Sequence, residues 1–272
     1  MMLYMKTKNT NTYYVQPFSK NRKNISLLLD EAKRKHTVYA LLELDITQAK
    51  QLIHHQKKTG VDISFTAWLM KCIAHAASQH PQLNSYRKGR RKTVVFNEID
   101  IPLTIEKTIC GETRPVVCLI RNVQEKTIET ITHEIRRAQQ QKTEKNTQII
   151  GIEKKAIQRV ALSAPACIQK TLLVFLRRKP LLKKKYMGTI GVTSIGMLGT
   201  FPGWAVPLGG SLTTLVAIGG IRKKPGVVND SISIREFLHV TIAVDHDLID
   251  GGPLARFVNC FSNAVEQACF LQ

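Results

Sequence analysis

Runs of apolar residues broken by short polar stretches predict both strands and helices along this chain. The clearest strand is Phe237 to Val244 (FLHVTIAV), whose near-continuous apolarity is typical of a strand covered on both faces. Other strands are expected at 37–46, 92–107, 114–119, 189–193 and 212–218, and helices at 25–35, 47–58, 64–78, 123–141, 154–178 and 253–269. Because both types are interleaved, the pattern predicts a mixed α/β sandwich with one large mixed sheet covered by helices.

The domain organisation follows from composition. Residues 1–23 are polar and basic, and they predict a loosely held N-terminal arm. No internal repeat or shift in composition divides the rest, so residues 24–272 are expected to form a single domain. A chain of 272 residues with 43% hydrophobic content is sufficient for one large core.

The chain is strongly basic, with a formal net charge of +20. Such a field suits an anionic small substrate, a nucleic acid or an acidic membrane surface. Nucleic acid is disfavoured, because no aromatic residue interleaves with the basic run at 87–92 to provide a stacking platform. The six cysteines form no CxxC pair and no zinc-ligand spacing, so we expect no metal site. With no export signal, a reducing, cytoplasmic location is expected.

One uncharged stretch, Trp204 to Ile221, is long enough to raise the question of a membrane span. Pro207 and two glycine pairs interrupt it, and they favour a loop followed by a buried strand. No membrane span is expected.

The first candidate for chemistry is H-x-x-x-D-G, at His246, Asp250 and Gly251, between an apolar strand and a predicted helix. A histidine at a strand end is held rigidly while its ring reaches a cleft, and the aspartate can fix the turn that orients it. The pair Gly251-Gly252 permits backbone angles that other residues would resist. Spacing alone leaves open a histidine that is simply satisfied inside a core turn.

The second candidate is the glycine-rich segment 188–199. Its Thr193 and Ser194 end a predicted strand, and such a hydroxyl can donate a hydrogen bond to a developing oxyanion. Alternatively, both hydroxyls cap local backbone groups. The glycines do not follow G-x-G-x-x-G, which excludes a dinucleotide-binding fold.

In this order, the two segments resemble the catalytic core of the dihydrolipoyl acyltransferases of 2-oxoacid dehydrogenase complexes, which share a fold with chloramphenicol acetyltransferase. The family's D-H-R-x-x-D-G reads D-H-D-L-I-D-G here, and its T-I-S-N/S-x-G-x-x-G reads G-V-T-S-I-G-M-L-G. Similar stretches occur at 22–26, 80–84, 97–105 and 115–122.

The resemblance implies a CoA-dependent acyltransferase. His246 would be the general base for a thiol of coenzyme A or of a lipoyl group supplied by another chain. Thr193 would stabilise the oxyanion, with Ser194 as second choice. Asp250 would be structural and paired with Arg22, and no metal is implied. The family assembles as trimers in which the histidine and the hydroxyl come from neighbouring subunits, so we expect a homotrimer or a larger homo-oligomer.

The sequence also departs from the family. Asp247 stands where an arginine is usual, and Gly111 to Pro115 (GETRP) stands for G-L-x-x-P. We also expect a stand-alone member without lipoyl and partner-binding domains. An acid beside the base can alter its pKa or the substrate charge that it accepts. These departures motivate an alternative, a catalytically inactive family member that acts as a scaffold or binding module.

Overall fold

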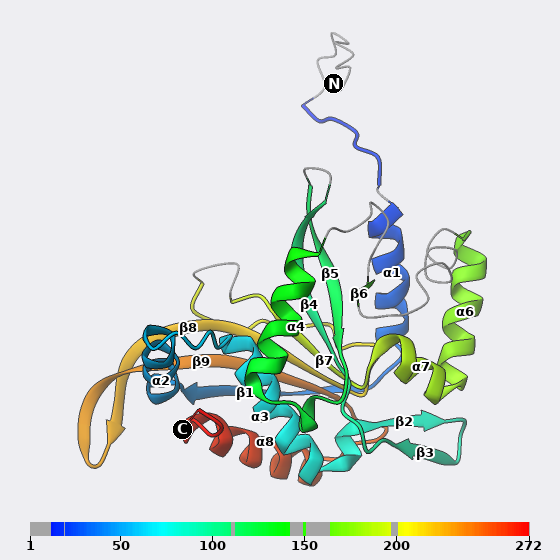
Figure 1. The fold of residues 1–272 in the computed structure, drawn as a ribbon. Coiled ribbons are helices and arrows are strands. Elements are labelled where there is room, and N and C mark those ends of the chain that lie inside the picture. Colours follow the sequence, from blue (N-terminus) through cyan, green and yellow to red (C-terminus); the bar gives the residue numbers. More distant parts are fainter. Residues whose placement is uncertain are drawn as a thin grey trace.

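A seven-stranded mixed sheet organises the molecule (Figure 1). The computed structural model describes residues 12–18, 20–109, 112–141, 149–150, 164–196 and 201–271. In spatial order the strands are β1 (Thr37–Asp45), β9 (Ser231–Asp245), β8 (Thr214–Val228), β7 (Ile190–Ser194), β4 (Ile101–Ile109), β5 (Glu112–Ile120) and β6 (Ile149–Ile150). A separate hairpin pairs β2 (Ser85–Lys88) with β3 (Lys92–Val95).

The helices fall into two groups in Figure 1, with α3, α4 and α8 together and α1, α6 and α7 apart from them. The first group comprises α3 (Phe65–Gln79), α4 (Ile128–Gln140) and α8 (Gly251–Glu266), and α2 (Thr47–Lys58) lies beside the far end of β9. The second group comprises α1 (Lys20–Ala32), α6 (Ala166–Arg178) and α7 (Pro180–Met187). Two short 3₁₀ turns, η1 (Pro81–Asn84) and η2 (Val123–Glu125), join elements near α3.

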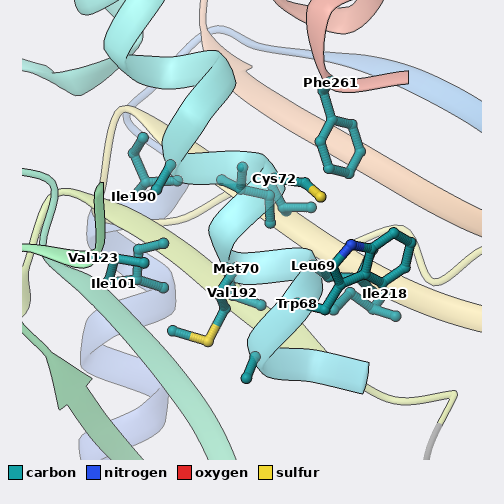
Figure 2. Close-up of a cluster of buried hydrophobic side chains, with 14 of the residues drawn as sticks. Trp68, Leu69, Met70, Cys72, Ile101, Val123, Ile190, Val192, Ile218 and Phe261 are labelled. Carbon is teal, nitrogen blue, oxygen red and sulfur yellow. The ribbon is translucent and has the colours of Figure 1, made fainter. Parts of the chain in front are cut away.

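Helix α3 is the centre of the hydrophobic core. Ser64 caps its first turn, because the Ser64 hydroxyl accepts a hydrogen bond from the Ala67 N–H. Figure 2 shows Trp68 and its α3 neighbours between residues of the sheet and Phe261 of α8. Trp68 is fully buried, and its indole N–H donates to the Cys269 carbonyl at 2.9 Å. Truncating such a buried residue to alanine costs about 3–5 kcal/mol, so the packing of Trp68 contributes strongly to holding α3 in the core.

The two faces of the sheet differ in chemistry. Along β9, alternate residues Leu238, Val240, Ile242 and Val244 belong to the core around α3 and α8. Their neighbours, which include His239, Thr241 and Asp245, therefore lie on the opposite face. The polar residues of the candidate site lie largely on this second, more polar face of the sheet or at its edge.

The predicted fold class, a mixed α/β sandwich with a large mixed sheet covered by helices, is confirmed. Most predicted elements are present, but 92–107 divides between two sheets as β3 and β4. Helix α1 begins at Lys20, inside the segment that was expected to be an arm; residues 1–11 lie outside the described residues, as do 142–148 and 151–163.

The largest difference concerns β8 and β9, which extend beyond their predicted lengths as a hairpin through 219–236. In the described ranges no helix is long and apolar enough to cross a bilayer. The uncharged stretch from Trp204 forms a loop and then the start of β8, as expected.

Candidate functional site

His246 follows directly after β9, in the turn that leads into α8. Its backbone N–H donates to the His36 carbonyl at 2.8 Å, which ties the turn to the residue just before β1. The side chain is 47% exposed, and Nδ1 lies 3.9 Å from Oδ1 of Asp250. Among the described residues Nε2 has no hydrogen bond or ion pair. The ring therefore lies just beyond a strand end and is partly open to solvent, whereas the expected cleft, in the pocket lined by Asp245 and Asp247, does not include His246.

Asp247, the acid in place of the family's arginine, is neutralised by two partners. Oδ1 lies 2.8 Å from Nδ1 of His36, and Oδ2 accepts from Nη1 of Arg87 at 3.0 Å. The hydrogen bond from His36, together with the charges of His36 and Arg87, holds the pKa of the Asp247 carboxyl below its ordinary value. The extra acid therefore does not present an unpaired negative charge beside His246.

Asp250 and the glycines after it begin α8. Asp250 is the N-cap residue, but its carboxylate makes no capping hydrogen bond and is 84% exposed. Gly251 and Gly252 do not use the conformational freedom that glycine permits, since neither has a positive φ. A Cβ added at Gly251 would meet nothing within 4 Å. The missing side chains leave open space at the start of α8.

The hydroxyls of Thr193 and Ser194 lie at the end of β7 on opposite faces of the sheet. Ser194 shares its face with the core residues Ile190 and Val192, and its buried Oγ has no hydrogen-bond partner among the described residues. Thr193 is half-buried on the second face. Neither hydroxyl caps a described backbone group, in contrast to the local-capping alternative.

Within one chain the base and the hydroxyl are far apart. In the sheet register Thr193 pairs with Ala217 of β8, and Ala217 pairs with Thr241 of β9. His246 lies five residues beyond Thr241, so strand spacing and rise separate the backbones of Thr193 and His246 by roughly 19 Å. Arg22 is in the first turn of α1, the end that Figure 1 shows pointing away from the sheet. A single chain therefore does not bring Arg22 and Thr193 to the His246 turn.

The backbone after Thr193 and Ser194 lies against a bulge in β8. The Gly196 N–H donates to the Ile218 carbonyl, and the Gly220 N–H donates to the Gly203 carbonyl at 2.9 Å. A Cβ on Gly220 would lie 1.8 Å from the Phe201 carbonyl oxygen, so only glycine fits. This contact fixes where residues 201–203 lie relative to the strand.

Four residues beside the His246 turn and the β8 bulge were not predicted from the sequence: His36, Arg87, Trp204 and His239. The Trp204 ring packs edge-to-face on His239, with centroids 4.5 Å apart, and its N–H donates to the Leu42 carbonyl. The His239 ring lies within hydrogen-bond distance of the Gly220 carbonyl and of Glu43. The glycine pair 219–220 inside an apolar run was the one available signal, because it indicates a close backbone approach.

The described residues contain no group of three or more His, Cys, Asp or Glu side chains placed to hold a metal ion. Of the segment 111–115, which departs from the family pattern, Gly111 lies outside the described residues and Glu112 to Pro115 begin β5.

Comparison with known proteins gives the family. The model of the 2-oxoacid dehydrogenases acyltransferase (catalytic domain) family matches residues 10–158 and 169–271. The chain belongs to this family. A 2-oxoacid dehydrogenase acyltransferase domain accounts for nearly all of the chain, including the His246 turn and the end of β7.

Relatives and solved structures agree with this assignment. The dihydrolipoyllysine-residue acetyltransferase component of the pyruvate dehydrogenase complex of Rickettsia bellii is 22% identical over 274 residues, which cover 97% of this chain and 56% of that protein. A dihydrolipoamide acetyltransferase structure from Azotobacter vinelandii has a TM-score of 0.68 at 15% identity, covering 94% and 93% of the two chains. The cubic core of a pyruvate dehydrogenase multienzyme complex gives 0.65 at 14% identity, covering 98% and 97%. The chain spans between 24% and 56% of the length of the curated relatives that it matches.

Proposed function

We propose that the chain is a CoA-dependent acyltransferase that moves an acyl group between a thioester of coenzyme A or a lipoyl group and an acceptor. The observation that carries the proposal concerns His246. Its side chain is 47% exposed just after β9, and its Nε2 has no hydrogen bond or ion pair among the described residues. Family membership gives the reaction class, since the matched relatives are named acetyltransferase, acyltransferase and succinyltransferase components.

His246 acts as general base through Nε2. It takes the proton of the acceptor thiol, and the resulting thiolate attacks the acyl carbonyl carbon. When the tetrahedral intermediate collapses, the C–S bond to the leaving thiol breaks and that thiol regains a proton from His246. Asp250, whose Oδ1 lies 3.9 Å from Nδ1 of His246, keeps the structural role in the turn that the resemblance implies.

Thr193 supplies the oxyanion hydrogen bond, with Ser194 as second choice. Thr193 is favoured because it lies half-buried on the second face, whereas Ser194 points into the core. Because the two halves are roughly 19 Å apart within one chain, we propose that Thr193 comes from a second copy. The functional unit is then a homotrimer or a larger homo-oligomer, in keeping with the cubic core among the structural relatives.

The remaining predictions belong to the same proposal. Residues 24–272 are the catalytic domain. Arg22 is the partner expected for Asp250 and, since one chain does not bring the two together, it would come from a second copy. The lipoyl group comes from another chain, and the enzyme works in the cytoplasm without a metal. The paired state of Asp247 removes the main reason to expect an inactive scaffold, because its charge is already matched by Arg87 and His36.

The test is a thiol-release assay over a panel of acyl-CoAs with dihydrolipoamide and other acceptors. His246→Ala should lower kcat by about 10²–10⁴, because a general base typically contributes that factor. The matched control is His55→Ala, since His55 is an exposed histidine on α2. The control should keep wild-type turnover and melting temperature. Equal turnover in wild type and His246→Ala would refute the base assignment.

A further inference from the structure

A pocket of about 320 Å³ adjoins the His246 turn on the second face of the sheet. Helices α1, α6 and α7, strand β2 and the turn itself contribute its walls. Asp245 and Asp247 line it, but His246 between them does not. A molecule in this pocket would therefore lie beside the turn but not against the proposed base.

The described lining residues carry an excess of positive charge. Five cationic side chains face three carboxylates in this pocket: Arg34, Lys35, Arg87, Arg177 and Lys183 against Glu31, Asp245 and Asp247. Four of the cations form ion pairs with those carboxylates, at distances of 3.0 to 3.4 Å. All three carboxylates are thereby paired, and the cationic side chains of the lining outnumber them by two.

Lys183 is the cation that lacks an ion pair among the described residues. Its ammonium donates to the Ser211 carbonyl and lies 4.1 Å from the centroid of the Tyr86 ring. Burial, followed by repulsion from Lys35, lowers the pKa of the Lys183 ammonium to about 7. An anion held beside it would offset both effects, because an opposite charge favours the protonated form.

The rest of the wall is apolar. Leu173 and Leu176 of α6, Met187 of α7 and Leu248 of the turn line the pocket together with the cations. The volume is at the small end of the range for ligand sites in proteins, and a few charged groups within an apolar wall are the usual composition of such sites. The size admits a small molecule with one charged head and a short body.

We propose that this pocket binds a small anion, a phosphate or carboxylate group on a short apolar body, with Lys183 as its principal partner. His246 does not line the pocket, so the proposal does not depend on its role as base. Lys35 joins the two through Asp245, since its ammonium lies 3.1 Å from that carboxylate.

Binding of inorganic phosphate and of butyrate, each titrated calorimetrically into the full chain at pH 6.5 in a buffer free of both, tests the proposal. Lys183→Met removes the charge but keeps a long apolar side chain. Lys185→Met is the matched control, because Lys185 lies on the same helix but is exposed and does not line the pocket. Melting temperatures without ligand confirm that all three proteins are folded.

We expect wild type and Lys185→Met to bind at least one of the two anions at one site per chain, with equal Kd. Lys183→Met should bind it at least about tenfold more weakly, because hydrogen bonds to charged groups contribute that much. Phosphate and butyrate together distinguish a phosphate-bearing from a carboxylate-bearing ligand. Equal binding by all three proteins, or no binding by wild type, would overturn the proposal. Since the readout is binding, it is independent of whether His246 is the catalytic base.

Discussion

The His246 turn and the end of β7 are held in place by different forces. Ion pairs of Lys35, His36 and Arg87 with the aspartates on either side of His246 hold the turn at a partly exposed edge. By contrast, close backbone contact over glycines holds the segment after Thr193. Charge pairs near solvent weaken with salt and with acid, whereas a backbone contact tolerates both but admits no added side chain. The two halves of the proposed site should therefore fail under different perturbations.

The largest effect that separates the two halves is expected from the hydroxyls. Thr193→Ala should lower kcat by about 10²–10³, the usual result of losing one oxyanion donor, without lowering the melting temperature much. Ser194→Ala is the matched control, and it should leave kcat and stability nearly unchanged because the Ser194 hydroxyl is buried without a described partner. A larger loss of kcat in Ser194→Ala than in Thr193→Ala would show that Ser194, and not Thr193, donates the hydrogen bond to the oxyanion.

The next effect is steric. Gly220→Ala should lower the free energy of unfolding by about 1–3 kcal/mol, because the new methyl group would collide with the Phe201 backbone and force it to shift. Gly251→Ala serves as control: its Cβ would meet nothing, and alanine is favoured over glycine in a helix by about 0.5–1 kcal/mol. Chemical denaturation of both variants measures the difference, and equal stabilities would show that the bulge contact is not rigid.

The smallest effect concerns charge at the turn. Asp247→Asn should cost about 0–1 kcal/mol of stability near neutral pH, because the ion pairs of Asp247 are near the surface. The folded-state pKa of this carboxyl is lowered, so its contribution is present above the ordinary pKa of 3.8 and is lost as pH falls through the folded value.

The difference in stability between wild type and Asp247→Asn should therefore vanish at the acid end of a pH series of denaturation curves. Asp30→Asn, an exposed aspartate of α1, should show no such trend. A difference that persists unchanged in strong acid would contradict the role of the ion pairs.

Much of the fold was predictable because burial leaves a pattern in the sequence. The predicted core strand Phe237 to Val244 lies within β9, and helices α2 and α3 occur close to their predicted bounds. The outer hairpin of β8 and β9 was not predicted, because both of its faces meet solvent. Its Ile232 and Ile234 are 78% and 77% exposed, so their alternation with Ser231 and Ser233 does not mark a buried face of the strand.

The candidate site was only partly predictable. His246, Asp250, Thr193 and Ser194 were found from local motifs, since each motif lies within a few residues. Their surroundings come from distant segments: Arg87 is 160 positions from Asp247, and His36 is 211 positions away. A basic run such as 87–92 indicates exposure but does not identify which carboxylate one of its arginines will pair with.

The pairing of β1 with β9 also constrains how the chain is made. Thr37 pairs with Asp245 at one end of this ladder, and Asp45 pairs with Phe237 at the other. Synthesis proceeds at about 5–20 residues per second, so β1 leaves the ribosome roughly 10–40 s before β9 does. During that interval β1 has no neighbour on either side in the large sheet, because β9 is its one partner among the described strands. A newly made chain must therefore keep this strand from other sheet edges until nearly all of the polypeptide has emerged.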